Sequence, residues 1–350
     1  MDMWQGAADG DSAHEAFAAM DVTDGLPVVL PTPARVEQML KLHGYDPREV
    51  VTVLPPLFSK ATWQDIAINA VMAGCRPEYL PVVGAAIEAI AGDEFNLMGI
   101  GTTTGSAAPL IIVNGPIVKK LGINAAGNAL GPGNRANATI GRAVSLTLRN
   151  VGGARPGEVD MSTLGQPAKY TCCLAENESA SPWLPLHVER GFSPMASVVT
   201  VVGATGTLEV VDSISRTGAD LAQTFAQSML IAGTAGSGKL TLGSGEPLII
   251  LPPESAMIFE RDGYTKEKTK TAIYERAVMP LDRFSAAMRE RLMANAATAE
   301  AASDPHAAFR IARRAADIMI VVAGGVGIKA AYVPTWGETK AVSRQIRNSD

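Results

Sequence analysis

Short, wholly apolar runs alternate along this chain with longer segments in which apolar residues recur at helical spacing. The predicted strands cover residues 110–113, 197–202 and 248–251, and a further strand that opens into a glycine loop covers 317–325. The predicted helices cover residues 33–43, 62–72, 77–90, 136–150 and 218–232, one from about 254, and two charged helices between 265 and 300. We therefore predict an α/β fold with mainly parallel or mixed sheets covered by helices. Ligands of such sheets bind at the carboxyl ends of the strands.

Changes in composition divide the chain into three parts. Residues 1–20 are polar and rich in Ala and Gly, which favours a flexible N-terminal segment. Residues 21–194 are predicted to form an N-terminal α/β lobe. Its turn-rich segment from 152 to 194 is typical of a functional loop, because long irregular loops are uncommon inside compact domains. Residues 195–350 are predicted to form a C-terminal α/β lobe of similar size.

Composition and charge narrow the class of protein. A length of 350 residues with 47% hydrophobic content is enough for a large core. The net charge of -5, with no basic run, argues against nucleic acid as a partner. The start of the chain lacks the features of a secretion signal, and Arg76 and Pro81 interrupt the longest apolar run. We expect a cytoplasmic protein that does not enter membranes.

A glycine-proline turn at 131–142 predicts a site for an anion. Asn134 is placed to cap the helix that follows, and Arg135 adds charged donors where the helix dipole favours negative charge. Further polar residues in glycine-rich surroundings lie within fifty residues of this turn. The predicted ligand contacts are Thr103, Thr104, Asn114, Asn128, Asn134, Arg135, Asn137 and Arg142. The alternative is a well-capped helix with surface arginines.

The cysteines offer a second kind of chemistry. Cys75 lies between a helix-ending Gly74 and a helix-starting Pro77, beside Arg76, so we expect its thiol pKa to fall below about 8.5. Such a thiol serves as a nucleophile or redox group, whereas the alternative is a small buried hydrophobe. The adjacent Cys172 and Cys173 allow a strained disulfide, which is weaker evidence for redox chemistry.

Acid-base chemistry is the other possibility, because Glu176, Glu178 and His187 share the turn-rich segment. The alternative for His187 is a structural hydrogen-bonding role. Neither the three cysteines nor the four scattered histidines have the spacing of metal ligands, so we expect no metal site and no cofactor.

Two glycine-rich segments resemble nucleotide-binding loops only in part. Residues 233–241 match GxxxxGK, but Leu240 stands where Ser or Thr should bind magnesium, and we predict that Thr234 to Lys239 do not bind ATP. The segment 324–327 follows a predicted strand, but its glycine spacing does not fit a dinucleotide turn.

Several motifs together resemble a poorly characterised bacterial family whose members are partners, sometimes fused, of small proteins with a selenocysteine-or-cysteine, Gly, Ser, Cys motif. The motifs occupy residues 24–27, 71–79, 113–116, 131–142 and 175–178. The resemblance implies an enzyme subunit that works beside a separate thiol or selenol protein, and it favours a redox role for Cys75. The family has His at the positions of Ser255 and Lys329, so this copy lacks two candidate acid-base groups.

Three functions follow as hypotheses. The first is a cytosolic enzyme or enzyme subunit that acts on a small anionic, carboxylate-bearing metabolite, with Cys75 as nucleophile or redox thiol. The second is a cofactor-free lyase or hydrolase that uses Glu176, Glu178 or His187. The third is a non-catalytic ligand-binding subunit of a hetero-complex. We expect the protein to be an oligomer.

Overall fold

The computed structural model describes residues 10–231, 245–293, 308–337 and 339–347. Its two largest sheets mix parallel and antiparallel pairs and are accompanied by helices, so the predicted α/β class is confirmed. Two compact units make up the chain, and neither is continuous in sequence. Unit 1 is Met1–Glu176, His187–Gly203 and Ala341–Asp350, and unit 2 is Asn177–Leu186 and Ala204–Lys340. This division does not follow the predicted boundary between residues 194 and 195.

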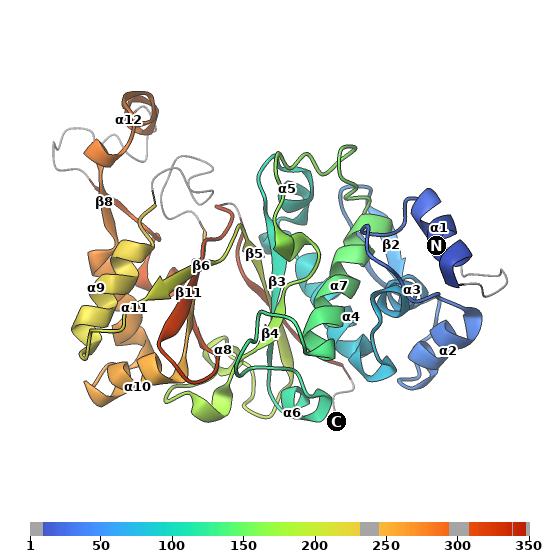
Figure 1. Ribbon diagram of the computed structural model, residues 1–350, viewed down its shortest axis with the longest axis horizontal. Helices are drawn as coiled ribbons and strands as arrows, with labels where there is room; N and C mark the ends of the chain where they lie inside the picture. The colour runs from blue at the N-terminus through green and yellow to red at the C-terminus, as the bar shows by residue number, and fades with distance from the viewer. Residues whose placement is uncertain (1–9, 232–244, 294–307, 338, 348–350) are drawn as a thin grey trace. The chain divides into compact units, whose positions relative to one another are not determined.

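Unit 1 is built on a four-stranded sheet in the order β12-β5-β3-β4. Figure 1 labels β3, β4 and β5 of this sheet. Its strands are β3 (Ala108–Asn114), β4 (Cys173–Ala175), β5 (Val198–Ala204) and β12 (Val342–Gln345), and a small hairpin adds β1 (Val50–Leu54) and β2 (Ser59–Thr62). Its helices are α1 (Gly10–Ala19), α2 (Pro33–Lys41), α3 (Trp63–Ala73), α4 (Leu80–Ile90), α5 (Leu97–Thr102), α6 (Ile117–Leu121), α7 (Arg135–Asn150) and α8 (Leu186–Glu189). β3 pairs in parallel with β4, and α7 packs against both strands.

The helix ends of unit 1 follow from local side chains. Thr62 and Asp65 form a reciprocal capping box at the start of α3, and Gly74 ends that helix at a φ of 88°. Asn134 caps α7 by accepting a hydrogen bond from the backbone of Asn137 at 3.0 Å. These bounds agree with the predicted helices. The helix predicted from Pro77 instead begins with a 3-10 turn, and α4 proper starts at Leu80.

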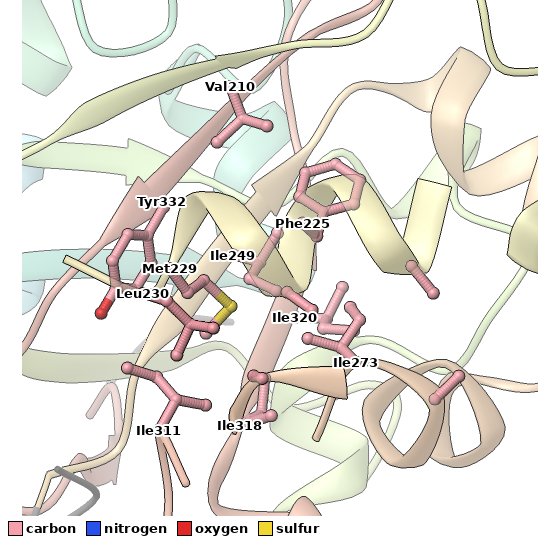
Figure 2. Packing of buried hydrophobic residues seen from close by; sticks show 14 of the residues in the cluster. Val210, Phe225, Met229, Leu230, Ile249, Ile273, Ile311, Ile318, Ile320 and Tyr332 are labelled. Carbon is pink, nitrogen blue, oxygen red and sulfur yellow. The ribbon is translucent and has the colours of Figure 1, made fainter. Parts of the chain in front are cut away.

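Unit 2 is built on a second four-stranded sheet in the order β10-β7-β11-β6. Its strands are β6 (Leu208–Val211), β7 (Leu248–Leu251), β10 (Met319–Val322) and β11 (Lys329–Val333), with a separate pair of β8 (Val278–Pro280) and β9 (Ala308–Arg310). Its helices are α9 (Gly218–Ser228), α10 (Pro253–Arg261), α11 (Lys266–Arg276) and α12 (Ala286–Met293). Figure 2 shows the core of this unit, where Phe225 of α9 and Met229, which directly follows α9, lie among Ile249, Ile320 and other buried apolar side chains.

The two sheets repeat one plan. In each, a wholly buried strand has a parallel neighbour reached through helices, β3 with β4 and β7 with β10. The next strand along the chain lies on the other side, β5 beside β3 and β11 beside β7. An antiparallel fourth strand completes each sheet, β12 on β5 and β6 on β11. The fourth strands are exchanged between the two sheets. β6 follows β5 in the chain but pairs in the sheet of unit 2, and β12 follows β11 but pairs in the sheet of unit 1.

The sequence carries the same repeat. Gly-Ser-Ala-Ala-Pro-Leu-Ile-Ile-Val, residues 105–113, corresponds to Gly-Ser-Gly-Glu-Pro-Leu-Ile-Ile-Leu, residues 243–251. The hydrogen bonds at the carboxyl ends also correspond: Glu176 N donates to Val113 O at 3.1 Å, and Ala323 N donates to Leu251 O at 2.9 Å. Shared order, sequence and hydrogen bonding indicate a duplicated sheet.

Several predictions need correction or fall elsewhere. Within the N-terminal segment 1–20, for which no helix is predicted, α1 occupies Gly10–Ala19, and the flexibility of this segment stays a prediction. The turn-rich segment 152–194 contains the short strand β4. The loop at 233–241, which is predicted not to bind ATP, lies outside the described residues.

Candidate functional site

The amides of the predicted anion turn hydrogen-bond to the protein itself. Asn137 is buried, and its side chain accepts from Asn124 N at 2.8 Å and donates to the carbonyls of Asn124 and Ala129. Asn134 donates to Gly122 O at 2.8 Å, and Asn128 donates to Pro132 O at 2.6 Å. These bonds fix the loop before α7, which is a structural role.

Both arginines of the turn also bind protein groups. Arg135 directs Nε and Nη2 to the carbonyl of Gly74 at 2.9 and 2.8 Å. Arg142 directs Nε and Nη2 to the two carboxylate oxygens of Asp24, each at 2.7 Å. Burial alone would raise the pKa of Asp24, but the hydrogen bonds and charge of Arg142 outweigh burial and hold the pKa below its ordinary value. Ligand contact by Arg135 and Arg142 stays a prediction.

The two predicted threonine contacts shape a loop near α5. Thr103 follows the end of that helix, and its hydroxyl accepts a hydrogen bond from Gly105 N at 3.0 Å. The carbonyl of Thr104 accepts from Thr163 N at 2.9 Å. The bond from Thr163 connects the segment before β3 to the segment that leads into β4.

The predicted acidity of Cys75 is wrong. Its side chain is buried, and Sγ lies 3.2 Å from the carbonyl of Thr139 on α7. Burial raises the pKa of Cys75 to about 12. The hydrogen bond to Thr139 and the charge of Arg135 lower the pKa, but by less than burial raises it. The expected helix start beside the thiol is a 3-10 turn instead. Burial also raises the pKa of Cys172 to about 12, and all three cysteines are free thiols.

The carboxyl end of the parallel pair in unit 1 carries a buried amide-carboxylate contact. Asn114 ends β3 and Glu176 directly follows β4, and their side chains are 0% and 1% exposed. Asn114 Nδ2 donates to Glu176 Oε2 at 2.7 Å. Gly115 allows the chain to turn away after Asn114, because a Cβ there would lie 2.2 Å from the carbonyl oxygen of Ala196. The structure thus brings together two residues that the sequence predicted for different roles.

The other two predicted acid-base residues belong to different units. Glu178 begins a 3-10 turn of unit 2, whereas His187 is fully buried in α8 of unit 1. Ser255, one of the two positions where the resembled family has His, is buried in the first turn of α10. The other, Lys329, is exposed at the start of β11.

The duplicated sheet offers an internal comparison for Asn114 and Glu176. Pro252 and Ala323 occupy the corresponding positions of unit 2, where they follow β7 and β10. The backbone hydrogen bond at this point is the same in both sheets. The sheet end therefore forms without an amide-carboxylate pair, and the pair is an added feature of unit 1.

Sequence reasoning missed a cavity of about 1030 Å³ in unit 1. It is lined by the start of β3, the second half of α7, α5, the segment around Asp21 and the loop from 154 to 170. Its charged lining residues are Asp21, Asp24, Arg149, Asp160 and Lys169. The available signal was Arg149, which lies two helical turns beyond Arg142 and so shares its face of α7.

An ion pair stabilises one wall of this cavity. Asp160 accepts from Lys169 Nζ at 2.5 Å and from the hydroxyl of Ser162 at 2.6 Å. Burial alone would raise the pKa of Asp160, but these hydrogen bonds and the lysine charge hold the pKa below its ordinary value. Lys169 is thereby held in place at the cavity wall.

No family model, curated protein or solved structure matches this chain. Within the part of the chain that the structure describes, no group of three or more His, Cys, Asp or Glu side chains is arranged to hold a metal ion. None of the helices in those same ranges is long and apolar enough to cross a membrane.

Proposed function

We propose that this chain is an enzyme or enzyme subunit that transfers a proton at Glu176, in the manner of a cofactor-free lyase or hydrolase acting on a small anionic metabolite. The observation that carries the proposal is the buried hydrogen bond from Asn114 to Glu176 at the carboxyl end of a parallel strand pair. Ligands of open α/β sheets bind at this end.

The internal duplication supports a functional rather than architectural reason for the pair. If the strand end required these side chains, unit 2 would carry polar residues in place of Pro252 and Ala323. Burying an amide and a carboxylate costs free energy unless both keep their hydrogen bonds. Unit 2 avoids this cost with apolar residues at the same positions, so the pair in unit 1 calls for a reason other than the architecture of the sheet.

The chemistry follows from the two functional groups. Glu176 Oε accepts a proton from a substrate carbon or from a water molecule, and the electron pair stays on the atom that loses the proton. Asn114 is a positioning residue, because its N–H fixes the carboxylate in one orientation. Thiol chemistry at Cys75 has less support, since a thiol with a pKa of about 12 is protonated at neutral pH.

The test is proton NMR in D₂O with the full chain and a panel of small hydroxy, keto and amino acids. We expect loss of a substrate C–H signal or appearance of a product, and a decrease in that rate of about 100-fold or more in Glu176→Gln. Glu254→Gln is the control, because Glu254 lies in the first turn of α10, shortly after β7 of unit 2, and should keep the wild-type rate. An unchanged rate in Glu176→Gln would contradict the proposal.

Absence of any reaction, combined with binding of a panel member, would instead favour the non-catalytic ligand-binding subunit. The separate thiol or selenol protein, the cytoplasmic location and the oligomer stay predictions alongside this proposal. Purification of the tagged chain from its native host, followed by mass spectrometry for a small thiol protein, tests the partner.

A further inference from the structure

The cavity of unit 1 is distinct from the Asn114–Glu176 pair. Residues 107–109 at the start of β3 line the cavity, whereas Asn114 is the last residue of that strand. At about 3.3 Å per residue, the two ends are roughly 20 Å apart. A ligand in the cavity is therefore not the molecule on which Glu176 acts, and the inference below stands independently of the proposed function.

The two arginines on one face of α7 are occupied to different extents. Arg142 uses Nε and Nη2 together to hold both oxygens of the Asp24 carboxylate, which is the complete side-on pairing of a guanidinium. Arg149, two turns further along, lines the cavity and directs Nη2 to Asp21 Oδ1 and to the Asp21 carbonyl. No described residue accepts a hydrogen bond from the buried Nε of Arg149. We call the Nε and Nη2 edge of this guanidinium its fork, and the fork is half filled because Asp21 accepts from Nη2 only.

Asp21 is a loosely held occupant of that fork. Its side chain is 55% exposed, whereas that of Arg149 is 14% exposed. Its second carboxylate oxygen lies 3.9 Å from Arg155, so the carboxylate is shared between two cations. The backbone of Asp21 has a φ of 52°, a conformation that non-glycine residues seldom adopt. Water can reach the exposed carboxylate and Arg155 is a second cation within reach, so Asp21 can leave Arg149 and still have other partners.

The apolar walls and the volume of the cavity indicate what kind of ligand body it can hold. Leu97 and Ile100 of α5 and Leu146 and Leu148 of α7 give it apolar walls. A volume of about 1030 Å³ is at the upper end of the range for small-molecule sites. An apolar wall beside a half-filled guanidinium fits a carboxylate attached to a compact apolar body.

We propose that this cavity binds a small monocarboxylate of that kind, and that its carboxylate takes the place of Asp21 on Nε and Nη2 of Arg149. Asp21 then competes with the ligand, because the fork accepts one carboxylate at a time. The apparent affinity is reduced by the fraction of molecules in which Asp21 occupies the fork.

The test uses hexanoate as the probe and hexanamide as its uncharged match, with dissociation constants from ligand-observed NMR on the full chain. We expect hexanoate to bind at least about tenfold more tightly than hexanamide, as charged hydrogen bonds to a guanidinium require. Asp21→Asn should bind hexanoate at least about threefold more tightly than wild type, because the competitor has lost its charge. Arg149→Lys, which keeps the charge but not the fork, should bind at least about tenfold more weakly.

Lys119→Gln is the control, because it removes one positive charge from the exposed surface of α6 and should leave both constants unchanged. Binding of hexanoate that is detected with Asp21→Asn but not with wild type would support the proposal, because the two proteins differ only in the carboxylate that competes for Arg149. Equal affinity for acid and amide, weaker or unchanged binding in Asp21→Asn, or no binding by either protein would overturn it. The Asp21→Asn measurement keeps the test decisive if Arg149→Lys does not fold.

Discussion

Individual arginines of α7 show how far residue-level reasoning extends. The sequence indicated correctly that Asn134 caps the helix, because a cap depends on neighbours three residues away. It did not reveal that Arg135 and Arg142 bind Gly74 and Asp24, since these partners are 61 and 118 residues distant in the chain. The partner of Arg149, Asp21, is 128 residues distant and could not be predicted for the same reason. Charged side chains were identifiable, but their acceptors depend on the fold.

The Asp24–Arg142 pair predicts a specific dependence of stability on pH. Because the folded pKa of Asp24 is lowered, its contribution is present above the unfolded value near 3.8 and is lost as the pH falls through the folded pKa. We expect Asp24→Asn to lower the free energy of unfolding at pH 7 by about 1 to 3 kcal/mol. The difference from wild type should shrink below about pH 4.

Urea denaturation at pH 7 and at pH 3 measures this effect. Glu37→Gln on the exposed face of α2 is the control, and it should change stability little at either pH. A difference between Asp24→Asn and wild type that stays constant with pH would show that the carboxylate charge is not what stabilises the pair.

Helices were predicted more accurately than strands, for a physical reason. The ends of α3 depend on Thr62, Asp65 and Gly74, which are adjacent to the helix itself. β4, β6 and β12 have only three or four residues, and their partners lie far away in the chain. β7 and β10 are as short, but each is a wholly apolar run of four residues and was predicted. β4, β6 and β12 have no aliphatic run of that length, so their existence depends on pairing that local patterns do not contain.

The contact of α7 with the segment before β4 gives a prediction at this scale. Glycine inside a helix normally costs about 1 kcal/mol relative to alanine, so Gly→Ala should stabilise the helix. At Gly141, however, a Cβ would lie 2.4 Å from Thr171 Oγ1 and 2.7 Å from the backbone nitrogen of Cys172. Because overpacking costs about 1 to 3 kcal/mol, we expect Gly141→Ala to lower the free energy of unfolding by at least about 1 kcal/mol.

Chemical denaturation of Gly141→Ala measures this loss, and Ala138→Gly on the exposed face of the same helix calibrates it. Ala138→Gly should cost about 1 kcal/mol through helix propensity alone. A stabilising effect of Gly141→Ala would mean that α7 can move away from the Thr171 segment at little cost.

At the scale of the whole molecule, the duplicated sheet was present in the sequence and was overlooked. The related segments at 105–113 and 243–251 are separated by more than a hundred residues, so windows that detect helices and strands do not compare them. The α/β class was predictable because strand and helix patterns alternate. The sharing of fourth strands was not, because it is a property of long-range pairing.

This sharing predicts the effect of removing β12. A chain ending at Lys340 lacks Val342 and Ile346, which are buried in unit 1, and leaves one side of β5 without its partner. We expect native-state hydrogen exchange to show lost protection of β5 amides, with protection of β7 retained because β12 is not part of its sheet. A chain ending at Arg347 is the control and should keep both. Equal loss in β5 and β7 would indicate that the units unfold as one.

The exchange of fourth strands also sets the order in which the sheets can be completed during synthesis. Translation produces β3, β4 and β5 early, but β12 only after all of unit 2's strands, whereas β6 is made before β7, β10 and β11. The sheet that begins first is therefore finished last. Until β12 emerges, the nascent chain presents an unpaired edge of β5, a strand that is fully buried in the finished fold.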